Sequence, residues 1–76
     1  MAQPTSAEHA RLGTALRTIR KEKQLTIEEL AGKAKLNPRY LAGVERGEIN
    51  IAVTNLLKVV AALGTSLEVM ARRADI

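Results

Sequence analysis

Stretches in which apolar residues recur at helical spacing alternate along the chain with short polar stretches that separate them. In the first such stretch the apolar residues stand at i, i+3, i+4 and i+7: Leu12, Ala15, Leu16 and Ile19. Residues at this spacing lie on one face of an α-helix. We expect this helix to begin at Ser6, or at Thr5 with Glu8 as its capping pair, and to end within the polar run 20–24.

A short second helix is predicted to begin at a capping box. In the stretch 26–29, Thr26 can accept a hydrogen bond from the third amide of the helix, and Glu29 can reach back to the N–H of Thr26. The apolar face of this helix consists of Ile27, Leu30, Ala31 and Ala34. The pattern therefore predicts a helix of two to three turns.

A third helix is predicted to begin at Asn37-Pro38. Asparagine is a strong N-cap, and proline suits the first helical position because its missing N–H would have no partner there. Leu41 and Val44 are the expected buried pair of this helix, and Gly47 is its stop signal. The stretch 46–50 then reads as a turn.

The remaining residues predict a fourth helix from about Ala52 to Leu63, with Gly64 as its stop signal. Its expected inward side consists of Val53, Leu56, Leu57, Val60 and Leu63. The tail 66–72 fits either a short helix or a strand, and we favour the helix, in which Leu67, Met70 and Ala71 are buried. The sequence thus predicts an all-α fold in one domain over residues 1–76, with residues 1–6 disordered.

The charge of the chain is concentrated in its middle. Twelve Lys and Arg against eight Asp and Glu give a net charge of +4. Eight of the basic residues and four of the acidic ones lie between Arg17 and Arg46, so this segment carries the whole net charge. A basic segment of this kind favours a nucleic-acid partner.

Several classes of protein are disfavoured by what the sequence contains. There is no cysteine and one histidine, His9, so neither a disulfide framework nor a thiolate metal site is expected. Glu28 and Glu29 are adjacent on a predicted helix, where their side chains diverge and cannot act as an acid–base pair. We therefore expect no enzyme, cofactor, metal or small-molecule ligand. RNA binding by base stacking is disfavoured because Tyr40 is the only aromatic residue.

The sequence also bears on location. The first ten residues lack the apolar run of a signal peptide, and no stretch approaches the roughly 18 apolar residues that a membrane helix needs. A cytoplasmic protein without a membrane partner is expected.

The second and third helices are spaced as a helix-turn-helix, in which one helix crosses the DNA backbone and the next enters the major groove. About three residues, 35–37, join them. Ala31 is small enough to let the helices cross closely, and Leu36 can anchor the corner. Leu41 and Val44 give the third helix one apolar side, which leaves its other side free for DNA.

These residues resemble the phage-repressor and Cro-like (Xre-type) helix-turn-helix family. The resemblance rests on the segments 16–20, 25–34, 37–41 and 44–47, on Asn50, and on the segments 56–58 and 62–64. The size and the stretch from Glu45 to Leu63 are similar to those of restriction–modification controller proteins within that family. The resemblance implies a lambda-repressor-like fold of five helices, in which helices two and three bind double-stranded DNA.

The resemblance also implies roles for single residues. Base-edge contacts would come from Asn37, Pro38, Arg39, Ala42, Gly43 and Ile27. Phosphate contacts would come from Thr26, Tyr40, Arg46, Asn50 and Lys35. A structural ion pair would join Arg20 to Glu45. Arg39 is the best candidate for direct readout, because a guanidinium can bind O6 and N7 of guanine together. Lys35 stands where the family often has glycine, and in a left-handed conformation it would carry a strain of roughly 1 kcal/mol.

A homodimer is expected because the fourth helix has more apolar surface than one core needs. The predicted dimer interface consists of Ile49, Ile51, Val59, Leu67 and Met70. A two-fold dimer would set two recognition helices about 34 Å apart and would read a near-palindromic operator. The alternative is an antitoxin-type protein-interaction module that also binds DNA, although few residues follow Gly64 to supply the extra surface. RNA polymerase is a further candidate partner, for Glu28 and Glu29.

Overall fold

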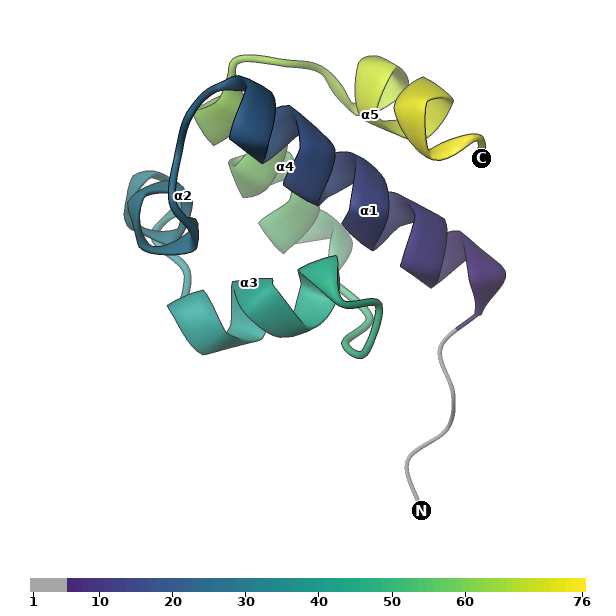
Figure 1. The fold of residues 1–76 in the computed structure, drawn as a ribbon, viewed down its shortest axis with the longest axis horizontal. Coiled ribbons are helices and arrows are strands. Elements are labelled where there is room, and N and C mark those ends of the chain that lie inside the picture. The colour runs from purple at the N-terminus through teal and green to yellow at the C-terminus, as the bar shows by residue number, and fades with distance from the viewer. Residues whose placement is uncertain (1–5) are drawn as a thin grey trace.

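Five helices make up residues 6–76, the part of the chain that the computed structural model describes (Figure 1). They are α1 (Ala7–Glu22), α2 (Ile27–Ala34), α3 (Pro38–Glu45), α4 (Val53–Leu63) and α5 (Leu67–Ala74). Within these residues there is no strand, so the C-terminal segment adopts the favoured helix. The all-α, five-helix prediction is confirmed.

The beginnings of the helices follow the capping residues of the sequence. Side-chain oxygens of Ser6, Thr26, Asn37 and Ser66 accept hydrogen bonds from free N–H groups at the starts of α1, α2, α3 and α5. Ala52 precedes α4 and offers no such acceptor. Ser6 is therefore an ordered cap, contrary to its predicted disorder; the rest of the segment for which disorder was predicted, residues 1–5, lies outside the described residues, as does the alternative cap Thr5.

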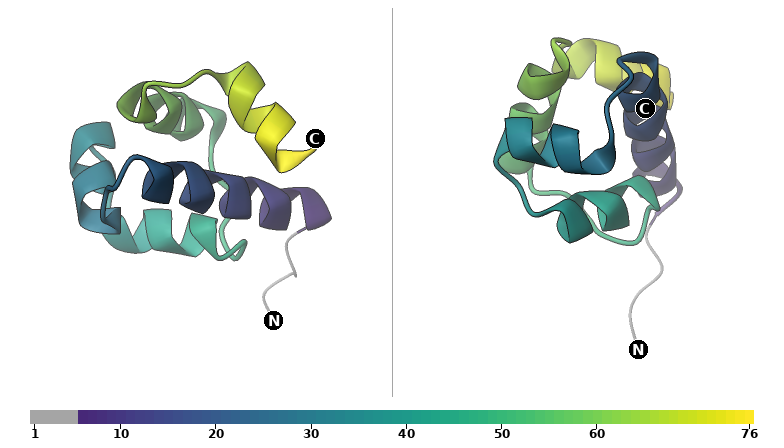
Figure 2. Two further views of the ribbon diagram at one scale, coloured as in Figure 1. Left: turned by 45° about the horizontal axis from the view of Figure 1, so that its top comes forward. Right: turned by 60° about the vertical axis from the view of Figure 1, so that its left-hand side comes forward.

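All five helices contribute to one core. The largest side chains with no exposed surface are Leu16, Leu30, Leu41, Met70, Val44 and Val59. The helix-turn-helix pair is held between the others, because α1 packs on α3 and α4 packs on α2. Figures 1 and 2 show α1 between α3 on one side and α5 on the other. The outer side of α3 therefore faces away from α5.

The buried side of α4 differs from the prediction. Val53 is 67% exposed and Leu57 is 47% exposed, whereas Val59, Val60 and Leu63 are buried. The sequence of α4 is apolar around most of its circumference, so two overlapping stripes at helical spacing were available. Packing against α2 and α5 selects the stripe that contains Val59.

This change corrects part of the predicted dimer interface. Val59 and Met70 have no exposed surface, and Ile51 is 8% exposed, because all three belong to the core of the single chain. Ile49 is half-buried and packs against the same core. Of the five residues predicted for the interface, Leu67 alone is well exposed, at 41%.

No single helix among residues 6–76 is long and apolar enough to cross a membrane. Only α4 and α5 taken together satisfy the length and composition of a span, and their axes are bent by 98° at the break between them.

The position of α3 against α1 depends on a glycine that the apolar pattern did not identify. Gly13 is buried in α1, and a Cβ atom on it would lie 2.6 Å from the carbonyl oxygen of Glu45 and would also collide with that of Val44. At the other end of the same contact Gly47 has φ +77°, and a Cβ there would lie 3.0 Å from the Cα of Ala10. Hydrogen atoms in place of side chains therefore let the end of α3 lie directly on α1.

We predict opposite effects for one chemical change at two helical glycines. Gly13→Ala should lower the free energy of unfolding by about 1–3 kcal/mol, because backbone atoms would have to move to admit the methyl group. Gly32→Ala should raise it by up to about 1 kcal/mol, since a Cβ at Gly32 has nothing within 4 Å and alanine is the better helix former. Urea unfolding of both variants tests this; equal effects would contradict the close contact at Gly13.

Candidate nucleic-acid interface

The two central helices meet at the corner that the sequence predicts. After α2, Lys35 takes a left-handed conformation with φ 58° and ψ 45°. The N–H of Leu36 then donates to the carbonyl of Ala31 at 2.9 Å, which closes the end of the helix. Ala31 is fully buried, and Leu36 packs against the core. The turn is therefore formed as expected, and Lys35 has the left-handed conformation in which a lysine is strained.

The N-terminal end of α3 projects into solvent beyond this corner. Asn37, Pro38 and Arg39 are all exposed. The backbone N–H of Arg39 is bound to Oδ1 of Asn37 at 2.8 Å, but within residues 6–76 its guanidinium has no hydrogen bond or ion pair. Arg39 thus carries five unused N–H donors at the tip of the helix.

Capping uses the hydrogen-bond acceptors of two predicted contact residues, Thr26 and Asn37, and leaves their donors for DNA. The Thr26 hydroxyl oxygen accepts from the N–H of Glu29 at 3.0 Å, and Oδ1 of Asn37 accepts from the N–H groups of Arg39 and Tyr40. What remains on Thr26 is its O–H donor, and on Asn37 its amide N–H donors. Phosphate oxygens only accept hydrogen bonds, so the Thr26 hydroxyl matches the phosphate contact predicted for it. The Asn37 amide can donate to an acceptor on a base edge.

Tyr40 has a structural task beside its predicted contact with phosphate. Its ring packs against the core, and its hydroxyl oxygen accepts from the N–H of Ala52 at 3.3 Å and from Nδ2 of Asn55 at 3.1 Å. These bonds tie α3 to the start of α4, the one described helix without a side-chain cap. The hydroxyl proton remains available for donation.

A hollow between α1, α2 and α3 brings together residues from three separate parts of the sequence. Ile27 and Ala42 form part of its wall, and two exposed, positively charged residues, Arg17 and Arg46, also line it. Three of these residues were predicted to contact DNA. Arg17 was not, because the periodicity of the first helix identifies its buried side and says nothing about which exposed residue adjoins the corner.

One predicted base contact is wrong. Gly43 is buried, and a Cβ on it would lie 2.8 Å from Cγ1 of Ile49. The glycine therefore admits the Ile49 side chain of its own chain, and that side chain covers the place where DNA would have approached. A glycine allows close approach, but the sequence does not show which group approaches it.

The other candidates remain accessible. Lys35 and Asn50 are exposed. Arg46 is exposed and bonds Glu48 through Nε at 3.1 Å, with 56% and 62% of the two side chains accessible. Exposed pairs of this kind contribute little, so Arg46 can exchange this partner for phosphate. Glu29 is committed to the capping box, so of the two glutamates assigned to polymerase only Glu28 has a free carboxylate.

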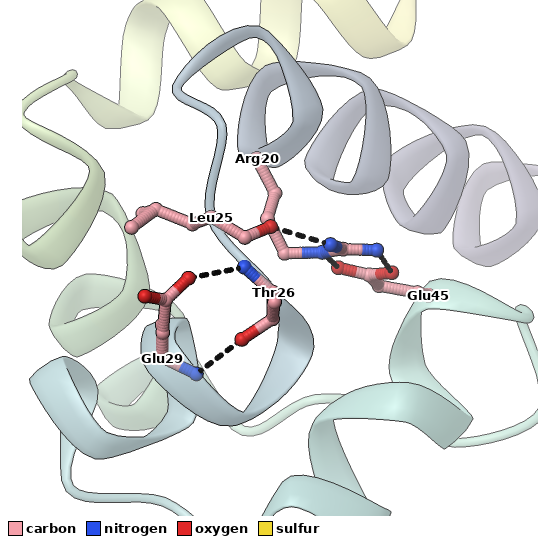
Figure 3. Close-up of polar contacts among 5 residues, drawn as sticks. All are labelled: Arg20, Leu25, Thr26, Glu29 and Glu45. Atoms are coloured by element: carbon pink, nitrogen blue, oxygen red, sulfur yellow. Dashed lines mark hydrogen bonds and ion pairs between the residues drawn. The ribbon is translucent and has the colours of Figure 1, made fainter.

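The orientation of α3 is fixed by Arg20, which forms the predicted ion pair with Glu45 (Figure 3). Nε donates to Oε2 at 2.7 Å and Nη2 donates to Oε1 at 3.0 Å. Nη1 donates to the carbonyl of Leu25 at 2.7 Å. The hydrogen bonds that Arg20 donates to Glu45 raise the pKa of Arg20 against the opposing effect of burial, so the guanidinium stays charged.

We predict a large loss of stability when this pair is broken on one side. The side chains of Arg20 and Glu45 are only 11% and 6% exposed. Glu45→Ala should therefore lower the free energy of unfolding by about 3–5 kcal/mol, because the guanidinium is left without its counter-charge. A double-mutant cycle with Arg20→Ala measures the coupling; single effects that simply add would show that the two groups do not act together.

The chain is similar in sequence to known helix-turn-helix proteins. The family model for helix-turn-helix proteins matches residues 16–70. The immunity repressor of Bacillus phage phi105 is 43% identical over 53 residues, which are 70% of this chain and 37% of the repressor. The chain therefore spans just over a third of that relative's length.

Two solved structures superpose on nearly the whole chain. The clp gene regulator ClgR from C. glutamicum has a TM-score of 0.88 at 35% identity, over 95% of this chain and 92% of the other. The restriction–modification controller protein C.Esp1396I, solved as a tetramer with its natural 35 base-pair operator, has a TM-score of 0.85 at 28% identity, over 92% of this chain and 93% of the other.

Proposed function

Because the chain belongs to the Xre- and Cro-like helix-turn-helix family of DNA-binding transcriptional regulators, we propose that it binds a near-palindromic operator as a homodimer. The observation that carries this proposal is the tip of α3, where the Arg39 guanidinium is exposed and unpaired within the described residues. No enzymatic activity is part of the proposal, in keeping with a family of regulators.

Base reading is assigned to the exposed start of α3. Arg39 binds guanine in the major groove through two hydrogen bonds. Pro38 and the free amide of Asn37 lie beside it, and Ile27 and Ala42 contact the thymine methyl or sugar surface from the hollow next to α3. Gly43 has no part in this reading, because Ile49 covers it.

Phosphate contacts are assigned to donors on both sides of α3. Thr26 and Tyr40 each retain a hydroxyl proton. Arg46, Asn50 and Lys35 extend the contacts from the α2–α3 turn to the α3–α4 loop, and we add Arg17 on the strength of the hollow it shares with Arg46. These groups position α3 on the duplex without selecting a sequence.

We expect Arg39→Ala to lower affinity for the operator by about 1–3 kcal/mol, which is roughly fivefold to 150-fold. The operator is first obtained by selecting bound sequences from random DNA. Selectivity at one base pair of each half-site should relax, and the melting temperature should stay unchanged, because Arg39 packs against nothing in the core.

Arg72→Ala is the matched control. Arg72 lies on α5, on the opposite side of α1 from α3 (Figure 1), and it should retain wild-type affinity and selectivity. Full sequence discrimination by the Arg39 variant would rule out its assigned role.

The dimer is assigned to a revised interface, composed of Val53, Leu57 and Leu67. Val53 and Leu57 are one turn apart on α4, and their exposed fractions of 67% and 47% are high for apolar side chains. Leu67, at the start of α5, is 41% exposed. Burying apolar surface of this kind stabilises a dimer by about 25 cal/mol for each Å² removed from water. A two-fold contact buries this surface on both copies at once.

We expect Leu57→Glu to weaken self-association at least tenfold, because the interface would then hold a carboxylate that has no partner. Sedimentation across a concentration series measures this. Thr18→Glu, the same added charge on an exposed residue of α1, is the control and should leave the dimer intact. A sedimentation profile of Leu57→Glu that matches the wild type would remove α4 from the interface.

A further inference from the structure

An open hollow of about 410 Å³ lies between the end of α2 and the second half of α4. Its lining consists of three lysines and three alanines: Lys33, Lys35, Lys58, Ala34, Ala61 and Ala62. Ala34 is buried, Ala62 is half-buried, and Ala61 and the three lysines are exposed. Neither the base contacts nor the phosphate contacts proposed above account for Lys33 or Lys58.

The three lysines have no counter-charge. Within residues 6–76 none of them forms a hydrogen bond through its side chain or an ion pair. Glu29 stands four residues before Lys33, the spacing of a helical salt bridge, but its carboxylate is turned to the N–H of Thr26 at 2.8 Å. The sequence of α4 contains no acidic residue. The hollow is therefore a site of uncompensated positive charge.

Lys35 has the left-handed conformation that closes the end of α2, with φ 58°. A lysine in this conformation is strained where glycine would not be. Lys33 and Lys35 also stabilise the negative end of the α2 dipole. That effect does not explain Lys58, which sits in the middle of α4.

We propose that this hollow, here called the lysine hollow, binds a phosphate of the DNA backbone that flanks the groove entered by α3. Lys35 is two residues from Asn37, so the lysine hollow continues the basic surface around the start of α3. A phosphate carries the complementary charge, and its oxygens accept from all three ammonium groups. The contact lengthens the footprint and adds affinity that does not depend on sequence. This inference rests on the proposed function.

The test is the salt dependence of binding to two duplexes, the selected operator and the same operator extended at both ends. Lys58→Gln should reduce the slope of log K against log salt by about 0.9 for each lysine hollow engaged, on the extended duplex only. Lys21→Gln, an equal charge change at an exposed residue near the C-terminal end of α1 (Figure 2), should leave the slope unchanged.

A second variant separates binding from folding. Lys35→Gly relieves the left-handed strain and should raise the melting temperature while it weakens binding to the extended duplex. A poly-glutamate peptide is the competing probe. If the peptide binds in a manner that depends on Lys58 while the duplex slopes of Lys58→Gln and Lys21→Gln agree, the lysine hollow serves an acidic protein segment and the proposal is wrong.

The outcomes distinguish this inference from the function on which it rests. If the wild type selects no operator from random DNA, the proposed function fails. If it does select one, and Lys58→Gln and Lys21→Gln give the same slope on the extended duplex, the lysine hollow alone is refuted.

Discussion

One guanidinium determines where the DNA-facing helix lies. Arg20 extends from α1, holds both carboxylate oxygens of Glu45 at the end of α3, and uses its remaining nitrogen on the carbonyl of Leu25, just before α2. Three elements thus share one planar group whose bonds are directional. Apolar packing alone would allow α3 to slide or rotate by a fraction of a turn, and these bonds remove that freedom.

Close backbone contact complements the ion pair. At Gly13 the helix α1 has no side chain between itself and the carbonyl groups that end α3, and at Gly43 the third helix admits Ile49 from the loop that follows. Each contact fixes a separation that a methyl group would increase. The exposed face of α3 can therefore vary in sequence without disturbing the scaffold, because the groups that hold the helix lie on its other side.

The sequence predicted most of the scaffold and part of the surface. Capping residues such as Thr26 and Asn37 set helix starts through local hydrogen bonds, and local bonds can be read from neighbouring residues. The stripe on α4 could not be chosen in this way, because Val59 and Leu57 are equally apolar and only the packing of α2 and α5 decides between them. For the same reason Gly43 was assigned to DNA and Arg17 was overlooked. The role of each of these residues depends on which residue from a distant part of the sequence lies beside it in the fold.

The capping bonds of α2 and α3 have a consequence for the thermodynamics of recognition. Thr26 and Asn37 are already held by hydrogen bonds to their own helices, and Tyr40 by bonds that it accepts from the start of α4. Their rotamer freedom is lost when the chain folds, so docking on a duplex costs these side chains little further entropy. Arg39 alone among these four must still be immobilised. The duplex thus meets three groups that are already held in place, and Arg39 is the one of the four that binding must order.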